Sequence, residues 1–98
     1  MRRRVDCVAV YKMNAPDIKA EAGKIILKGR GLIVSVKVVD YALHSEVVCL
    51  NRAKREAVTQ LYDKPDALKV AHKVAEILGF IEKKYTGKGK CFRYFEAR

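Results

Sequence analysis

The segment from Asp63 to Gly79 constrains the fold most, because it has helix signals at both ends. Asp63 is placed to cap a helix, and Pro65 and Asp66 suit the first turn. Gly79 is placed to end the helix in a left-handed conformation. Apolar residues recur between them at helical spacing, at Leu68, Ala71, Val74, Ala75 and Leu78. The sequence therefore predicts a helix that restarts near residue 63 and ends at Gly79.

The preceding segment, residues 32–50, gives two conflicting signals. Its many valines favour a strand. Its polar positions fall on one helical stripe, at Lys37, Asp40, His44 and Asn51. Valine lowers helix propensity by only a few tenths of a kcal/mol, and burial of an apolar side chain is worth about 1.5–3 kcal/mol. We therefore expect a buried helix that continues through residues 51–62. The alternative is a hairpin over residues 24–39 that turns at residues 29–31.

The two ends of the chain favour strands. Residues 3–13 and the apolar residues 24–27 are strand-like, and a short helix that Gly23 loosens is expected between them. Residues 80–95 are aromatic-rich at both ends and glycine-rich in the middle, which is typical of a β-hairpin. The expected fold is therefore α+β, in the order β-α-β-α-(α)-β-β. It forms a single domain over residues 1–98, with the helices on one face of the sheet.

Charges are spread so densely that several protein classes are excluded. The longest runs without a charged residue are six residues, whereas a membrane span needs about 20 apolar residues. Cys7, Cys49 and Cys91 are odd in number and far apart, which favours free thiols in a reducing cytoplasm. We therefore expect a cytoplasmic protein without a membrane segment or a disulfide framework.

The net charge of +10 is the strongest functional signal, because such an excess attracts a polyanion. It concentrates at the two ends of the chain. Residues 1–30 have eight basic and three acidic groups, and residues 61–98 have nine and five. Residues 31–60 have four and three. This distribution favours a nucleic acid as the partner.

Two stretches are candidate phosphate-binding sites. In the first, Lys28 and Arg30 alternate with Gly29 and Gly31 before the expected helix, whose N-terminus would add partial positive charge. The second is the hairpin, whose basic residues would form a positive arm along a nucleic-acid groove. These residues are Lys83, Lys84, Lys88, Lys90 and Arg93. Alternatively, the first stretch is an ordinary glycine turn, and the second is an edge hairpin that its lysines protect from aggregation.

No pattern in the sequence indicates an enzyme, a metal site or a cofactor. His44 and His72 belong to no H-E-x-x-H or H-x-E motif and have no cysteine at metal-ligand spacing. On the expected helix, His44 and Cys49 would point about 140° apart, too far for a nucleophile and its base. We therefore expect a non-enzymatic protein without a cofactor.

Residues 24–38, KIILKGRGLIVSVKV, resemble the second strand, basic turn and second helix of the Alba (Sac10b) family of archaeal chromatin proteins. The resemblance implies a small α/β domain that dimerises and binds DNA or RNA with little sequence preference. It places Lys12 at the first strand–helix junction, Lys28 and Arg30 in the basic turn, and Lys88 and Lys90 at the hairpin tip.

Together these features predict a homodimeric protein that binds duplex DNA or RNA through phosphate contacts with little base recognition. The dimer is expected because a helix as apolar as residues 32–50 has more surface than one small sheet covers. The alternative is a protein-interaction domain whose basic surface binds an acidic partner.

Overall fold

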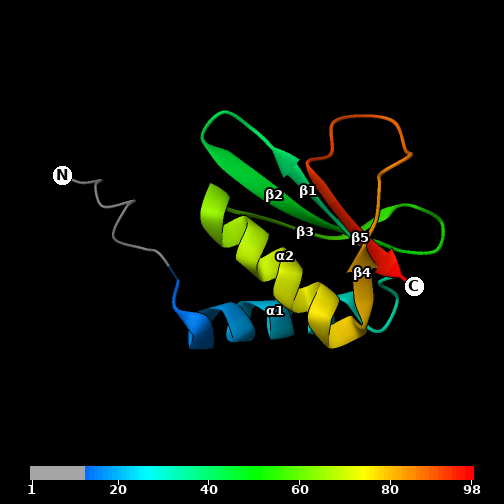
Figure 1. Cartoon of the computed structure of the whole chain (residues 1–98). Coiled ribbons are helices and arrows are strands. Elements are labelled where there is room, and N and C mark those ends of the chain that lie inside the picture. Colours follow the sequence, from blue (N-terminus) through cyan, green and yellow to red (C-terminus); the bar gives the residue numbers. More distant parts are fainter. Residues whose placement is uncertain (1–12) are drawn as a thin grey trace.

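Figure 1 shows the computed structural model, which describes residues 13–98. Within these residues, two helices and five strands follow one another in the order α-β-β-β-α-β-β. The elements are α1 (Ala15–Gly29), β1 (Ser35–Asp40), β2 (His44–Leu50), β3 (Glu56–Asp63), α2 (Lys64–Leu78), β4 (Phe80–Glu82) and β5 (Arg93–Ala97).

All five strands belong to one antiparallel sheet in the order β3-β2-β1-β5-β4. The strands β1, β2 and β3 form a meander. After α2 the chain adds β4 and β5, and β5 pairs with the remaining side of β1. This places β1 at the centre of the sheet, with Val36 opposite both Cys49 of β2 and Phe95 of β5.

The helices cover one face of this sheet (Figure 1). Helix α2 lies over β1 and β2, and α1 packs mainly against α2 and contacts β3. Alternate strand residues point toward the helices, as the two-residue period of a strand requires. They form the core with the apolar stripes of the helices, and include Val36, Val38, Val47, Cys49, Val58 and Phe95.

Helix α1 owes its length to a buried stripe that continues beyond Gly23. Ile18, Ala22, Ile25 and Gly29 are buried at spacings of four, three and four residues. The Asn14 side chain caps the helix by accepting a hydrogen bond from Asp17 N at 3.0 Å. The Ile33 side chain lies against Gly29 and occupies the space that a Cβ there would need.

The predicted helix over residues 64–78 is confirmed. Gly79 ends it with φ 76°, as expected of a glycine cap. Asp63 is the residue before the first turn, although its side chain makes no capping hydrogen bond. The predicted hairpin is also confirmed: β4 covers residues 80–82 of the predicted strand 80–85, and β5 covers residues 93–97 in place of the predicted 91–95. The α+β class and the placement of the helices on one face are confirmed as well.

Three predicted elements are wrong. Residues 24–27 are helical, because they continue the buried stripe of α1. Residues 35–50 form β1 and β2 instead of one buried helix. Residues 56–63 form β3, because they pair with β2 along its length. The alternative hairpin over residues 24–39 correctly places a strand after the turn, where β1 begins at Ser35. It is wrong about the residues before the turn, which belong to α1.

The Alba-like stretch folds in the reverse local order. Residues 24–38 form the end of a helix, a turn and a strand, whereas the resemblance implies a strand, a turn and a helix. The strand predicted over residues 3–13 lies almost wholly outside the described residues, and so does Lys12. A single domain over residues 1–98 stays a prediction for the same reason.

Candidate nucleic-acid interface

The face of the sheet opposite the helices, here called the open face, combines polar, aromatic and apolar side chains. Lys37 pairs with Val48 of β2 on one side and with Tyr94 of β5 on the other, so the three lie in one row. Val48 is 1% exposed and Leu50 is 8% exposed although neither faces the helices. The open face is therefore partly covered by its own side chains and loops.

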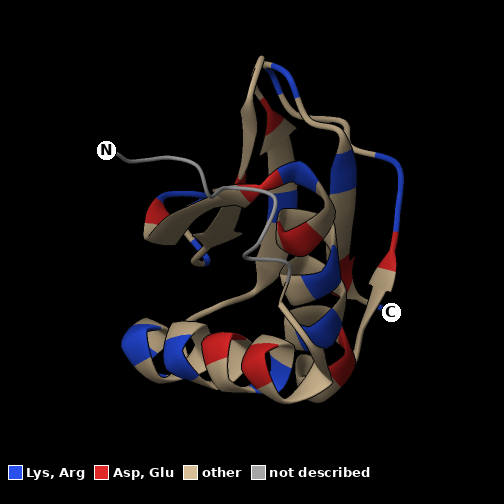
Figure 2. Ribbon diagram, turned by 90° about the vertical axis from the view of Figure 1, so that its left-hand side faces the viewer, with Lys and Arg blue, Asp and Glu red and all other residues tan. Residues whose placement is uncertain are grey.

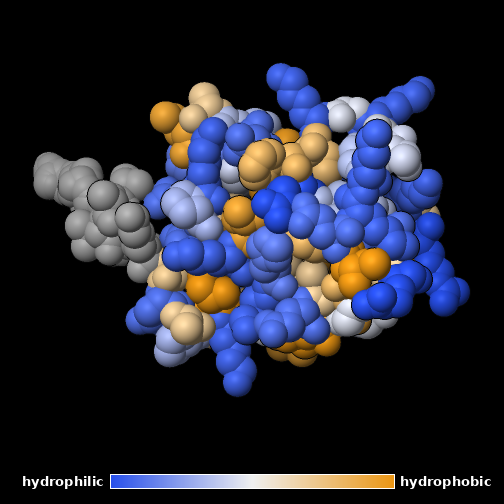
Figure 3. Space-filling view, viewed as in Figure 1, coloured by the Kyte–Doolittle hydropathy of each residue, from blue (hydrophilic) through white to orange (hydrophobic). Residues whose placement is uncertain are grey.

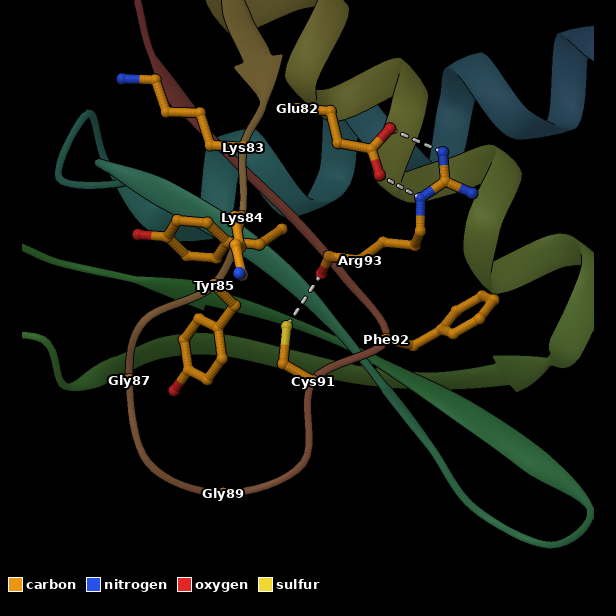
Figure 4. Close-up of a pocket in the computed structure, with 10 residues that line it drawn as sticks. Glu82, Lys83, Lys84, Tyr85, Gly87, Gly89, Cys91, Phe92 and Arg93 are labelled. Atoms are coloured by element: carbon orange, nitrogen blue, oxygen red, sulfur yellow. Dashed lines mark hydrogen bonds and ion pairs between the residues drawn. The ribbon is translucent and has the colours of Figure 1, made fainter.

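The β4–β5 loop (residues 83–92) bends over this face (Figure 4). The Tyr85 and Tyr94 rings lie 5.2 Å apart between centroids, tilted by 54°. Lys37 Nζ lies 5.4 Å from the centre of the Tyr85 ring, within the range of a cation–π interaction. Tyr85 Oη donates a hydrogen bond to the Lys88 carbonyl at 3.0 Å. Tyr85 is thus held over the sheet by its own loop.

The β2–β3 loop (residues 51–55) is built by one asparagine side chain. Asn51 Oδ1 accepts hydrogen bonds from Ala53 N at 2.9 Å and from Arg55 N at 3.1 Å. Lys54 has a positive φ of 61°, which the tight turn imposes on it. The turn exposes the side chains of Arg52, Lys54 and Arg55.

These two loops frame a hollow of about 190 Å³ on the open face. Arg52 and Lys54 line it from the β2–β3 loop, and Tyr85, Thr86 and Gly87 line it from the β4–β5 loop. Its floor comes from the sheet and from the end of the α1–β1 loop (residues 30–34), through Val34, Ser35, Lys37, Leu50, Tyr94 and Glu96. Three cationic side chains and one carboxylate therefore surround the space beside Tyr85.

A second hollow, of about 470 Å³, lies within the β4–β5 loop itself. Figure 4 shows Lys83, Lys84 and Tyr85 on one arm of the loop and Cys91, Phe92 and Arg93 on the other. Lys84, Lys88 and Lys90 are exposed and have no ion-pair partner among residues 13–98. The structure thus places these three predicted residues on a solvent-exposed basic loop.

The other two predicted hairpin residues are engaged within the protein. Arg93 donates hydrogen bonds to both carboxylate oxygens of Glu82, with 2.7 Å between Nη2 and Oε1. This ion pair lowers the pKa of Glu82. Lys83 Nζ lies 3.5 Å from Glu96 Oε1. Their charges are largely balanced, so they offer less to a polyanion than the exposed lysines do.

Lys28 and Arg30 are exposed, but the structure around them differs from the prediction. Lys28 lies in the last turn of α1, and Arg30 is its C-cap in a left-handed conformation with φ 52°. The predicted anion-binding helix N-terminus is therefore wrong, because a helix C-terminus has partial negative charge. The two side chains can contact phosphate as cations, without backbone N–H groups from a helix start.

Cations without an ion-pair partner lie at the end of α1, on three loops and on the open face between these loops. Figure 2 shows the basic residues of these loops and those of both helices. The α1–β1 and β2–β3 loops border each other, since Leu32 and Val34 share a hollow with Arg52. The group, here called the cationic surface, lacks ion-pair partners among residues 13–98. It comprises Lys28, Arg30, Lys37, Arg52, Lys54, Arg55, Lys84, Lys88 and Lys90.

The helix side of the molecule is better neutralised. Lys24 pairs with Glu21 on α1 at 3.2 Å, and Lys73 pairs with Glu76 on α2 at 2.7 Å. Seen from that side, hydrophilic side chains separate small apolar patches (Figure 3). Lys19 and Lys69, like Lys28 at the end of α1, are helix-borne cations without an ion-pair partner within the described part of the chain.

The described residues offer no site for a metal. Within residues 13–98, no three His, Cys, Asp or Glu side chains are grouped so that they could hold a metal ion. Cys49 and Cys91 are free thiols, as predicted, and Cys7 lies outside the described part. Burial raises the pKa of Cys49 to about 12, so this thiol stays protonated at neutral pH. Neither helix of the described chain is long and apolar enough to cross a membrane.

Comparisons with protein-family models, with curated proteins and with solved structures give no match to this chain. The candidate interface therefore depends on the geometry alone.

Six members of the interface were not predicted from the sequence: Lys37, Arg52, Lys54, Arg55, Tyr85 and Tyr94. The first four were assigned to helices. One signal could have located the β2–β3 loop. Asn51 and three basic residues among the next four separate two segments with β-branched residues, a pattern that favours a turn over a continuous helix.

Proposed function

We propose that this protein binds nucleic acid through the cationic surface, without enzymatic activity and with little base-sequence preference. The observation that supports it is the contrast between the two sides of the molecule. On the helix side, Lys24 and Lys73 are paired with glutamates, and Lys19 and Lys69 have no ion-pair partner among residues 13–98. At the end of α1, on the three loops and on the open face, nine cations have no ion-pair partner among residues 13–98. Such a one-sided field attracts a phosphate backbone.

The contacts are phosphate contacts, because the exposed groups are flexible lysines and arginines on loops. They displace condensed counterions from the nucleic acid, so the affinity depends steeply on salt. The β4–β5 loop supplies three of these cations, and the β2–β3 loop supplies three more.

Fluorescence polarisation of the full chain with labelled oligonucleotides, measured from about 20 to 300 mM salt, tests this proposal. We expect log affinity to fall linearly with log salt. Replacing Lys84, Lys88 and Lys90 together by Ala should flatten the slope by about 2 to 3 units on duplex DNA. The matched control replaces Lys19 and Lys69 by Ala, which removes unpaired cations from the helix side.

Two results would overturn the proposal. The first is the absence of binding to DNA and RNA, single- or double-stranded, at the lowest salt. The second is an equal loss per charge in the control and in the loop variant, which would show that the position of the cations is unimportant.

Homodimerisation and kinship with the Alba family stay predictions that do not support this proposal. The apolar helix that motivated the dimer is in fact β1 and β2 of the sheet. Sedimentation equilibrium on the full chain tests the dimer directly, and a monomer mass at tens of micromolar would contradict it.

A further inference from the structure

We infer that the partner is a single strand, and that one unpaired base stacks on Tyr85 in the 190 Å³ hollow between the β2–β3 and β4–β5 loops. This inference rests on the proposed function and specifies its substrate class. The phosphates on either side of that base contact Arg52, Lys54 and the lysines of the β4–β5 loop.

Tyr85 is held in place before any ligand arrives. Its hydroxyl is bonded to the Lys88 carbonyl, and its ring rests at a tilt against Tyr94. Gly87 packs so closely on the ring that a Cβ at this position would overlap it. An aromatic ring fixed in this way stacks on a base without a large loss of side-chain freedom on binding.

The surroundings of the ring are arranged for a nucleotide rather than for an apolar ligand. Both hollows of the loop region are lined by Tyr85 and Tyr94, so aromatic surface lies next to open space. Lys37, Arg52 and Lys54 line the smaller hollow with a single carboxylate, that of Glu96. Glu96 already accepts a hydrogen bond from Tyr94 Oη at 2.9 Å and pairs with Lys83, which leaves Arg52 and Lys54 free for phosphate, while Lys37 lies over the Tyr85 ring.

The depth of Tyr85 distinguishes a single strand from a duplex. The ring is half-buried between two loops, beside a hollow of about 190 Å³. The bases of a duplex are stacked on each other and cannot enter it, so a duplex contacts only the loop tips. An unpaired base can turn toward the ring, and base–aromatic stacking is worth about 1–3 kcal/mol.

The test compares Tyr85→Leu with Tyr85→Phe and with the control Tyr41→Leu, each titrated with a 12-nucleotide oligo-dT, a 12-nucleotide oligo-U and a 12-base-pair duplex. Tyr41 is a 51%-exposed tyrosine in the β1–β2 turn, outside both hollows. We expect Tyr85→Leu to weaken single-strand binding by about 5- to 100-fold while the duplex affinity and the salt slope stay unchanged. Tyr85→Phe should retain single-strand affinity, since it keeps the ring, and Tyr41→Leu should change nothing.

A measurement on the unaltered protein makes the result independent of how the variants fold. A 12-nucleotide strand containing 5-iodouracil is cross-linked by ultraviolet light, and the tryptic peptides are mapped by mass spectrometry. We expect the adduct on residues 85–88, the tryptic peptide that follows Lys84 and ends at Lys88. Tyr85 is the one aromatic residue of this peptide.

The outcomes separate this inference from the proposed function. Equal losses on single strand and duplex, no loss in Tyr85→Leu, or adducts confined to other peptides would overturn base stacking and leave phosphate binding intact. The absence of binding to every oligonucleotide would overturn both.

Discussion

At the scale of single residues, one hydrogen bond ties the first helix to the sheet. Tyr62 of β3 donates from Oη to Glu21 Oε1 of α1 at 2.9 Å. This bond is the main reason that the pKa of Glu21 lies below its ordinary value of 4.5, with a smaller contribution from Lys24. A carboxylate with a lowered pKa stabilises the fold above its ordinary pKa, and loses that contribution as the pH falls through the lowered value.

Tyr62→Phe should therefore destabilise the protein in a pH-dependent way. At pH 7 the loss of the hydrogen bond to an ionised carboxylate should lower the free energy of unfolding by about 1–2 kcal/mol. Below pH 4.5 the difference from the unaltered protein should shrink, because Glu21 becomes protonated. Urea unfolding at pH 7 and pH 3 measures both values. The same difference at the two pH values would contradict the assigned role of Glu21.

Gly87→Ala offers a second test at this scale. The added Cβ would overlap the Tyr85 ring, which must then leave its hydrogen bond to Lys88. Because the loop is exposed, we expect the free energy of unfolding to change by less than about 0.5 kcal/mol. Single-strand affinity should nevertheless fall, and duplex affinity should not. An unchanged single-strand affinity, measured by polarisation, would show that the resting position of the ring is unimportant.

At the scale of elements, two exposed glycines in the helical layer should respond in opposite directions to the same substitution. Gly23 lies inside α1, and a Cβ added there would meet nothing within 4 Å, so Gly23→Ala should stabilise by about 0.5–1 kcal/mol. Gly79 caps α2 with φ 76°, so Gly79→Ala should destabilise by about 1–2 kcal/mol. Thermal unfolding of both variants measures the pair, and shifts of equal sign would contradict the helix boundaries.

The same scale shows why some elements were predictable from sequence and others were not. Helix α2 has local signals at both ends, and these do not depend on the rest of the fold. Strands β1 and β2 lack such signals, because the turn at residues 41–43 contains neither glycine nor proline. Val48 and Leu50 are buried on the open face, so the alternation that marks a half-exposed strand is lost. The helical spacing of the polar residues in this segment is a coincidence and does not reflect a helix.

The candidate site was predictable to a similar degree. Lys88 and Lys90 alternate with Gly87 and Gly89, a local pattern that indicates an exposed basic tip. Arg93 is neutralised by Glu82, which lies eleven residues earlier on the neighbouring strand. This ion pair can be inferred only when the pairing of β4 with β5 is known. The contact of Lys37 with Tyr85 likewise joins residues 48 positions apart, and no local signal announces it.

At the scale of the whole molecule, salt should act in opposite directions on the free and the bound protein. A net charge of +10 repels itself, and salt screens this repulsion as the Debye length falls from about 30 Å at 0.01 M to about 8 Å at 0.15 M. The Tm of the free protein should therefore rise with salt.

A bound oligonucleotide stabilises the fold, by about 4 kcal/mol at a thousandfold excess over Kd, and salt weakens that binding. With oligonucleotide present, Tm should start higher, fall with salt and meet the free-protein curve. The variant lacking Lys84, Lys88 and Lys90 should show a flatter dependence in both conditions. Two parallel rising curves would mean that the charge excess shapes stability without recruiting a nucleic acid.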